Sequence, residues 1–376
     1  MSERHHAAGS YAKVSSETPP AHTPPTAAEQ AAQPPTSLPD AKPGRSRILA
    51  FAVLCVLCLA LAIGSITWAA MRGRAATTSS QPVTVASNAS APVVAPTDQP
   101  FVLFQHVARD QHYAKIAFAP IGTPNESRTV TGLTCERVYF AAGQGLCLLT
   151  EGGLINQYFA YTFGPDFRPR HKIAMAGLPS RARISSDGRY GTATVFVHGH
   201  SYADGNLSTQ TILIDMATGA TLGELEQFTV ERDGADIKAV DFNFWGVTFA
   251  HDSNRYYATL ATGGQTYLVE GDVAARTMRV RRENVECPSL SPDNKRIAFK
   301  KRMPGRNVTW RVHVLDLETM QETPVNEARS VDDQVEWLDD QTILYAVDAD
   351  VWSVPADGSG APTKFVAQAL SPAIVR

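Results

Sequence analysis

The chain has 376 residues and a formal net charge of −3, with 34 Lys and Arg against 37 Asp and Glu. This near balance argues against a nucleic-acid partner, because nucleic-acid-binding domains carry a clear excess of basic residues. Composition changes sharply along the chain, and the changes divide it into residues 1–46, 47–71, 72–100 and 101–376.

Residues 1–46 are rich in Pro, Ala and Thr and contain almost no large apolar side chains. A segment of this composition cannot bury a core, so we expect a disordered cytoplasmic tail. One interpretation is a simple spacer. The other is a tail that is phosphorylated or bound by a partner, with Thr18 and Thr23 as candidate sites.

Residues 48–71 contain no charged side chain, and this length is enough to cross a bilayer as a helix. We therefore predict a transmembrane helix over 47–71. Arginines flank both ends, so their charge does not by itself set the orientation. The large β domain and its cysteines favour a single-pass cell-membrane protein with its N-terminus in the cytoplasm and its C-terminal domain outside. A cleaved signal peptide is the alternative.

Residues 72–100 are rich in Ser, Thr, Ala and Pro without an apolar period, which predicts a flexible linker. Beyond it, Cys135 and Cys147 flank the sequence ERVYFAAGQGL, where residues 141–145 can turn a hairpin. The two cysteines would then face each other on adjacent strands. An even pair outside the membrane indicates a disulfide, with two reduced core cysteines as the alternative. Cys287 stands alone and is expected in the core.

Residues 285–325 form one four-stranded unit, in which the turn Ser291-Pro292-Asp293-Asn294 follows the first strand. Pro, Asp and Asn are residues that favour such turns. A single sheet cannot bury both of its faces, so it implies further copies of itself. Three copies are present: residues 181–225, 247–280 and 334–366. A longer interval after the first of them predicts an insertion at 228–244, in the fourth blade.

Two further units precede these copies. Residues 101–132 supply three strands, one fewer than a complete blade, and residues 134–176 supply four. Residues 369–375 (ALSPAIV) are left over and resemble an innermost blade strand. We predict that they pair with residues 101–107 and complete blade one. The fold class is therefore all-β, a six-bladed β-propeller over residues 101–376.

The stretches SPDNKRIAF (291–299) and HVLDLE (313–318) resemble the WD40-like PD40 repeats of TolB-type propellers. The resemblance is carried by residues 181–376. The whole chain is most similar to the membrane-anchored TolB-like proteins of high-GC Gram-positive bacteria. This resemblance implies a TolB-like propeller that binds partners in the cell envelope.

A search for catalytic motifs finds no G-x-S-x-G, no H-E-x-x-H and no phosphate-binding loop. His198 and His200 have the spacing of two metal ligands on an extended chain, but no third ligand is placed, so we expect no metal and no cofactor. A hydrolase or lyase at the channel mouth would have to use scattered groups: His106, His112, His251 and Asp241.

Charge is distributed unevenly over the last blades. Residues 276–311 carry 11 Lys or Arg against three acids, and residues 316–350 carry 11 Asp or Glu against a single Arg. Neighbouring strands can pair these charges, which adds only ~0–1 kcal/mol for each exposed pair. Otherwise they form a polarised rim that orients a partner. The candidate partner-binding residues are Arg281, Arg282, Lys300 and Lys301.

These observations predict a membrane-anchored, extracytoplasmic and non-catalytic module that binds a protein or an anionic envelope component. Two alternatives stay open. One is a propeller hydrolase or lyase, and the other is a subunit of a cell-envelope division or secretion complex.

Overall fold

The computed structural model describes residues 49, 53–58, 60–61, 84–86, 93–197 and 208–376. The chain divides into two units, residues 1–80 and 81–376. No helix among the described residues is both long and apolar enough to cross a membrane. The predicted tail lies outside the described residues, as do most of the predicted span and both His198 and His200.

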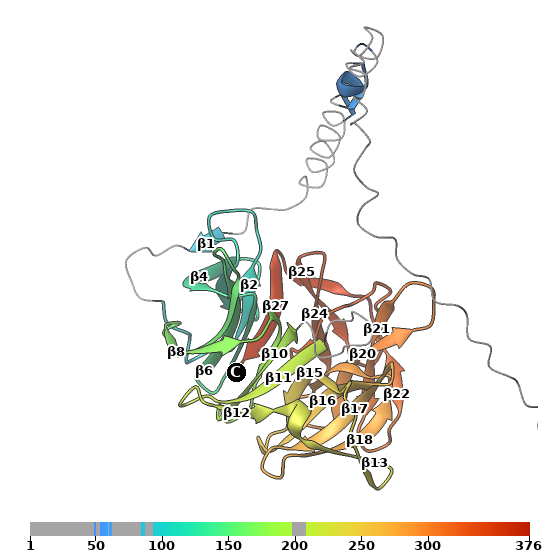
Figure 1. The fold of residues 1–376 in the computed structure, drawn as a ribbon. Helices are drawn as coiled ribbons and strands as arrows, with labels where there is room; N and C mark the ends of the chain where they lie inside the picture. The colour runs from blue at the N-terminus through green and yellow to red at the C-terminus, as the bar shows by residue number, and fades with distance from the viewer. Residues whose placement is uncertain (1–48, 50–52, 59, 62–83, 87–92, 198–207) are drawn as a thin grey trace, which may run out of the picture. The chain divides into compact units, whose positions relative to one another are not determined.

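The second unit is built from six β-sheets (Figure 1). From the channel outward, blade one contains β27 (Ala369–Val375), β2 (Phe101–His106), β3 (Lys115–Pro120), β4 (Ser127–Thr134) and β1 (Thr84–Ala86). Blade two contains β5 (Arg137–Ala141), β6 (Gln144–Glu151), β7 (Gln157–Phe163) and β8 (Pro169–Met175). Blade three contains β9 (Leu178–Ile184), β10 (Tyr190–Val197), β11 (Ser208–Asp215) and β12 (Thr221–Glu224), followed by the short 3-10 helix η1 (Leu225–Gln227).

The remaining blades continue the same order. Blade four contains β15 (Asn243–Phe249), β16 (Arg255–Thr262), β17 (Gln265–Asp272), β18 (Thr277–Glu283), β13 (Thr229–Arg232) and β14 (Ala235–Ile237). Blade five contains β19 (Glu286–Leu290), β20 (Arg296–Met303), β21 (Thr309–Asp316) and β22 (Glu322–Pro324). Blade six contains β23 (Glu336–Trp337), β24 (Thr342–Val347), β25 (Asp350–Pro355) and β26 (Thr363–Val366).

The innermost strands close a ring, because β27, β5, β9, β15, β19 and β23 contact one another in that cyclic order. The ring is completed by β27, which comes from the end of the chain and pairs antiparallel with β2 (Figure 1). Its register runs from Phe101 opposite Val375 to His106 opposite Ala369. The six-bladed propeller and the predicted closing strand are both confirmed.

The hydrophobic core is divided into six clusters, one at each junction between neighbouring blades. At the junction of blades six and one, for example, Leu344 and Val351 pack with Val102 and Phe104, all with no exposed surface. Each blade therefore buries one face against the preceding blade and the other against the next. This is why the sequence needs several copies of the same unit to make a stable core.

The repeated turn between the first two strands of a blade has a specific hydrogen-bond pattern. In blade three the hydroxyl of Ser185 donates to Asp187 Oδ1 at 2.7 Å and accepts the N–H of Tyr190 at 2.9 Å. In blade five the hydroxyl of Ser291 also donates to Asp293 and accepts a backbone N–H at 3.0 Å. These bonds satisfy backbone groups that the turn leaves unpaired, which explains the repeated Ser-x-Asp motif.

The insertion predicted at 228–244 lies in blade four, where β13 and β14 extend the sheet, whereas Asn243 and Phe244 already belong to the innermost strand β15. β13 pairs parallel with β18, and β14 pairs antiparallel with β13. The predicted linker also ends earlier than expected. Within it, β1 pairs parallel with β4, and Ala95 is buried and donates its N–H to the Pro165 carbonyl at 2.7 Å. The last part of residues 72–100 therefore belongs to the propeller.

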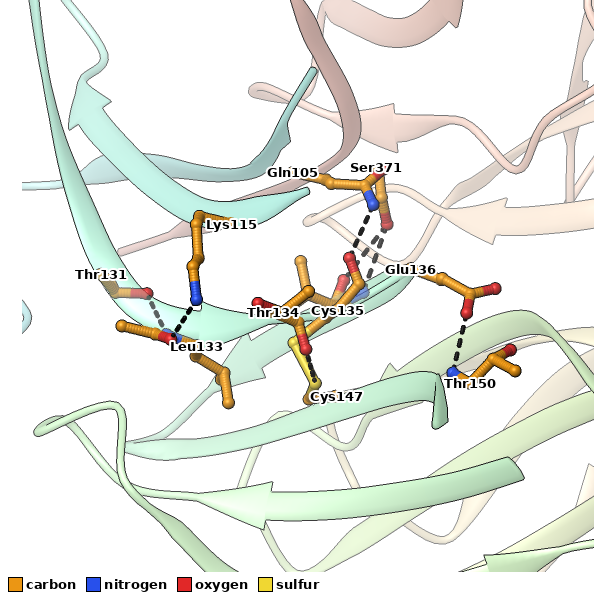
Figure 2. Close-up of a disulfide and its surroundings, with 12 residues drawn as sticks. Gln105, Lys115, Thr131, Leu133, Thr134, Cys135, Glu136, Cys147, Thr150 and Ser371 are labelled. Carbon is orange, nitrogen blue, oxygen red and sulfur yellow. Dashed lines mark hydrogen bonds between the residues drawn. A yellow bond between two sulfur atoms is a disulfide. The ribbon is translucent and has the colours of Figure 1, made fainter. Parts of the chain in front are cut away.

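Cys135 and Cys147 are joined by a disulfide, with their Cα atoms 5.4 Å apart (Figure 2). Cys135 lies between β4 and β5, and Cys147 lies in β6 opposite Val138. The Gln105 side chain donates to the Cys135 carbonyl at 2.7 Å. The bond thus ties the connection between blades one and two to the second strand of blade two.

Candidate functional site

One end of the central channel opens into a cavity of about 270 Å³. Each innermost strand contributes to its wall, with Tyr139, Arg183, Thr248, Ser289, Glu336 and Ile374 as one residue from each. The rest of the lining comes from the ends of these strands and from the residues that follow them. The cavity is therefore a property of the closed ring, since no single blade could form it.

The floor of the cavity is an ion pair that spans the channel. Arg183 Nη1 lies 3.0 Å from Glu336 Oε2, and the two side chains are only 8% and 7% exposed. The guanidinium lies over the ring of Tyr139 at 4.5 Å, and the Tyr139 hydroxyl donates to Glu336 Oε1 at 3.3 Å. Arg183 also donates to the Val335 carbonyl at 2.8 Å.

These contacts decide the electrostatics of the floor. Burial raises the pKa values of Glu336 and Tyr139, while the charge of Arg183 opposes both shifts. A buried charge without a partner would be very unfavourable, so Arg183 and Glu336 depend on each other. Because the two charges are paired with each other, neither is left as an unpaired acid or base for catalysis.

The rim of the cavity is held by bonds between turns of neighbouring blades. The Ser186 hydroxyl of blade three donates to the His251 carbonyl of blade four at 3.0 Å. The backbone N–H of Asp293 in blade five donates to Asp340 Oδ1 in blade six at 2.9 Å. The side chains of Ser186 and His251 are exposed at this rim. These bonds give the rim a defined shape before any ligand binds.

Below the floor, paired polar side chains fill the channel. Gln334 donates from its amide to the carbonyls of Val247 at 3.1 Å and Pro288 at 2.8 Å. Arg181 lies 3.6 Å from Asp333 Oδ1, again across the channel. The Gln334 amide thus satisfies carbonyls on the inner edges of β15 and β19, which have no further strand to pair with. A ligand entering from the cavity would therefore meet a closed floor.

The four basic residues selected from the sequence do not form one free basic surface. Arg282 and Lys301 share the carboxylate of Glu322, at 2.8 and 2.6 Å. Arg281 lies 3.4 Å from a glutamate of β17. The side chain of Lys300 is only 4% exposed and pairs with an aspartate, which removes it from surface recognition. A contact role for the other three stays a prediction.

The groups considered for an enzyme do not meet at the cavity, although the rings of His106 and His112 lie 6.4 Å apart. His251 is the only one of the four among the residues lining this cavity. His106 is buried in blade one and bonds Asp110. Asp241 accepts the Thr262 hydroxyl and the Gly263 N–H at 2.7 Å each, which caps a turn. Among the described residues, no three His, Cys, Asp or Glu side chains are grouped so as to hold a metal.

Sequence reasoning did not identify Tyr139, Arg183 or Glu336. The sequence did contain a signal for this pair. Some innermost strands carry a charged residue that faces the channel, although their other residues are apolar or small. Buried charges are rare unless they are paired, so two such strands indicate a pair across the channel.

Comparison with known proteins supports the fold. No family model matches the chain, and no curated protein gives a significant match. Among solved structures, TolB from Acinetobacter baumannii matches with 13% identity and a TM-score of 0.50, over 74% of this chain and 67% of that chain. The structure described as a nidogen/laminin complex matches with 10% identity and a TM-score of 0.50, over 73% and 98%. A putative TolB from Agrobacterium tumefaciens matches with 11% identity and a TM-score of 0.43, over 71% and 87%.

The chain therefore contains a TolB-like six-bladed β-propeller. At these identities the similarity defines the fold and not a shared ligand, because one fold supports many functions.

Proposed function

We propose that this propeller is a non-catalytic recognition module that binds a protein segment or an anionic envelope component in the cavity at the end of its channel. The observation that carries the proposal is the cavity itself, which all six blades build and whose floor is closed by the Arg183–Glu336 pair. A pre-formed concave site with a few placed polar groups is typical of binding sites.

The hydrogen bonds at the rim favour binding over catalysis. The hydroxyls of Ser186 and Ser253 lie 3.2 Å apart, and Ser186 also bonds a backbone carbonyl. Among the described hydrogen bonds, none joins a histidine ring to either hydroxyl. An activated nucleophile needs a base at about 2.6–3.2 Å, so these serines act as turn residues.

We also propose that the propeller is held outside the cell membrane by residues 47–71, with the tail in the cytoplasm. The support is the uncharged apolar run described above. Protease added to intact, wall-stripped cells is expected to remove the propeller and spare the tail. Recovery of a soluble secreted form beginning near Ala75 would contradict the anchor.

A photo-crosslinking experiment tests the binding site. A photoreactive amino acid replaces His251 at the cavity rim, and the matched control replaces His112, a histidine in the β2–β3 loop. Strands alternate in direction along a blade, so this loop lies at the opposite end of the propeller. We expect a discrete adduct in native membranes from position 251 and none from position 112.

Two results would overturn the proposal. One is equal crosslinking from both positions or from neither. The other is turnover of a defined substrate by the purified full chain that is lost when His251 is changed to Gln, which would establish the enzyme alternative.

A further inference from the structure

A second cluster of titratable residues lies away from the cavity, at the junction where blade six meets blade one. His106 ends β2, and Arg128 lies on β4; both are only 1% exposed. Arg128 Nη1 lies 2.9 Å from His106 Nδ1. The other ring nitrogen of His106, Nε2, lies 3.0 Å from the nearer carboxylate oxygen of Asp110.

The partners of His106 determine where its proton lies. A guanidinium has only donors, so Nδ1 must accept from Arg128 and cannot carry a proton. The proton of the neutral ring therefore lies on Nε2, which donates to Asp110. This arrangement requires a neutral His106, because a second proton on Nδ1 would place two donors and two positive charges face to face.

Arg128 connects this histidine to the closure of the propeller. Its Nη2 donates to the Ala367 carbonyl at 2.6 Å, and its Nη1 lies 3.3 Å from the Gln368 carbonyl. These two residues link β26 to the closing strand β27. The Gln368 carbonyl also accepts the N–H of Val107 at 3.0 Å. Arg128 thus holds the segment from which the last strand starts.

Other charged groups near the cluster compensate Arg128 only in part. Arg128 belongs to none of the described ion pairs, and burial lowers its pKa to about 10 although Asp110 and Asp350 oppose this. Asp350 accepts the N–H of Gln368 at 2.8 Å and is itself paired with Lys364. The ring of His112 lies 6.4 Å from that of His106.

We propose that His106, Arg128 and Asp110 form an acid-sensitive latch on the closure, so that protonation of His106 releases Arg128 from residues 367–368 and loosens β27. Proton uptake puts an imidazolium against a guanidinium at a site where both side chains are only 1% exposed. Movement of Arg128 away from His106 relieves this repulsion and leaves the two carbonyls without their donor.

The direction of the pH dependence follows from the environment of His106. Burial lowers the pKa of His106, and although the bond to Asp110 opposes this, the charge of Arg128 lowers it further. In the unfolded chain His106 binds a proton at about pH 6.5, and in the folded chain it does so only at a lower pH. The contribution of neutral His106 to stability is therefore complete above about pH 6.5 and is lost as the pH falls. For one proton, the equilibrium constant changes by up to about tenfold per pH unit. Asp110 adds to this only below about pH 4, where an ordinary Asp titrates.

Hydrogen exchange of the full chain in detergent micelles tests the latch. Protection of the β27 and β2 amides is measured from about pH 7.5 to about pH 5, the range in which an ordinary histidine titrates. We expect the protection factors of β27 to fall by up to about tenfold per pH unit below about pH 6.5, with little change in β16 and β17 of blade four. Global loss of protection in all blades together would overturn the proposal.

Matched variants test the role of His106 separately from that of His112. In His106→Gln the amide oxygen can accept from Arg128 and the amide nitrogen can donate to Asp110, so the latch stays without a titrating group. We expect this variant to keep β27 protected at all pH values tested, and His112→Gln to behave like the natural protein. Arg128→Met should expose β27 at every pH. A His106→Gln chain with unchanged pH dependence would refute the latch, and if that variant does not fold, unchanged pH dependence in Arg128→Met would refute it equally.

Discussion

Replacement of Arg183 by Met is the most direct test of the buried ion pair with Glu336 at the floor of the cavity. Methionine retains an unbranched apolar stem but removes the charge that faces Glu336. The carboxylate, 7% exposed, would then lack the partner that lies 3.0 Å away in the natural protein. Breaking one side of a buried ion pair typically costs about 3–5 kcal/mol, because it leaves an uncompensated buried charge.

This cost sets the size of the effect on melting. For a large domain, 1 kcal/mol corresponds to about 2–4 °C, so we expect Arg183→Met to lower the melting temperature by about 6–20 °C. Loss of Arg183 removes a charge that lowers the pKa of Glu336, so Glu336 should become easier to protonate. A protonated carboxyl needs no counter-charge. The destabilisation should therefore be larger at pH 8 than at pH 5.

The assay is thermal and urea unfolding of the full chain at both pH values, with a double variant as the control. Gln at position 336 needs no counter-charge and can still accept from Tyr139, so Arg183→Met combined with Glu336→Gln should recover most of the loss. A cost of less than about 1 kcal/mol for Arg183→Met, the range of exposed ion pairs, would show that the two buried charges do not depend on each other. A double variant no more stable than the single one would contradict the pairing equally.

Three further predictions concern the fold. Deletion of residues 369–376 removes β27 and opens the ring, so cooperative melting should be lost; a truncated chain with an unchanged melting temperature would contradict the closure. Reduction of the Cys135–Cys147 bond should cost about 3 kcal/mol in the chain-entropy model, and denatured, non-reduced protein should leave both cysteines unlabelled by a thiol reagent. Lys300→Ser should lower the free energy of unfolding several times more than Lys301→Ser, because removal of the Lys300 side chain, 4% exposed, leaves a cavity, whereas that of Lys301 is 32% exposed. Equal effects in urea unfolding would argue against this.

The sequence by itself determined the repeated unit, the number of blades and the origin of the closing strand. These features depend on local signals. Strand alternation and the turn at Ser291–Asn294 are readable within one unit, and the leftover strand at 369–375 has only one vacant place in a closed ring. Blade four could also be assigned an insertion, because the interval between the copies at 181–225 and 247–280 is longer than the others. How the insertion pairs was not readable, since parallel addition of β13 to β18 depends on the exposed edge of a finished sheet.

Only the tertiary structure decided which polar residues meet. Tyr139 and Glu336 are separated by 197 positions and still share a hydrogen bond across the channel. Residues that are adjacent in the chain can also be separated by the fold. Lys300 and Lys301 point to opposite faces of one strand, so Lys300 is buried and Lys301 reaches Glu322. Local patterns specify strands and turns, whereas a site in the centre of a ring arises from contacts between strands that are far apart in the chain.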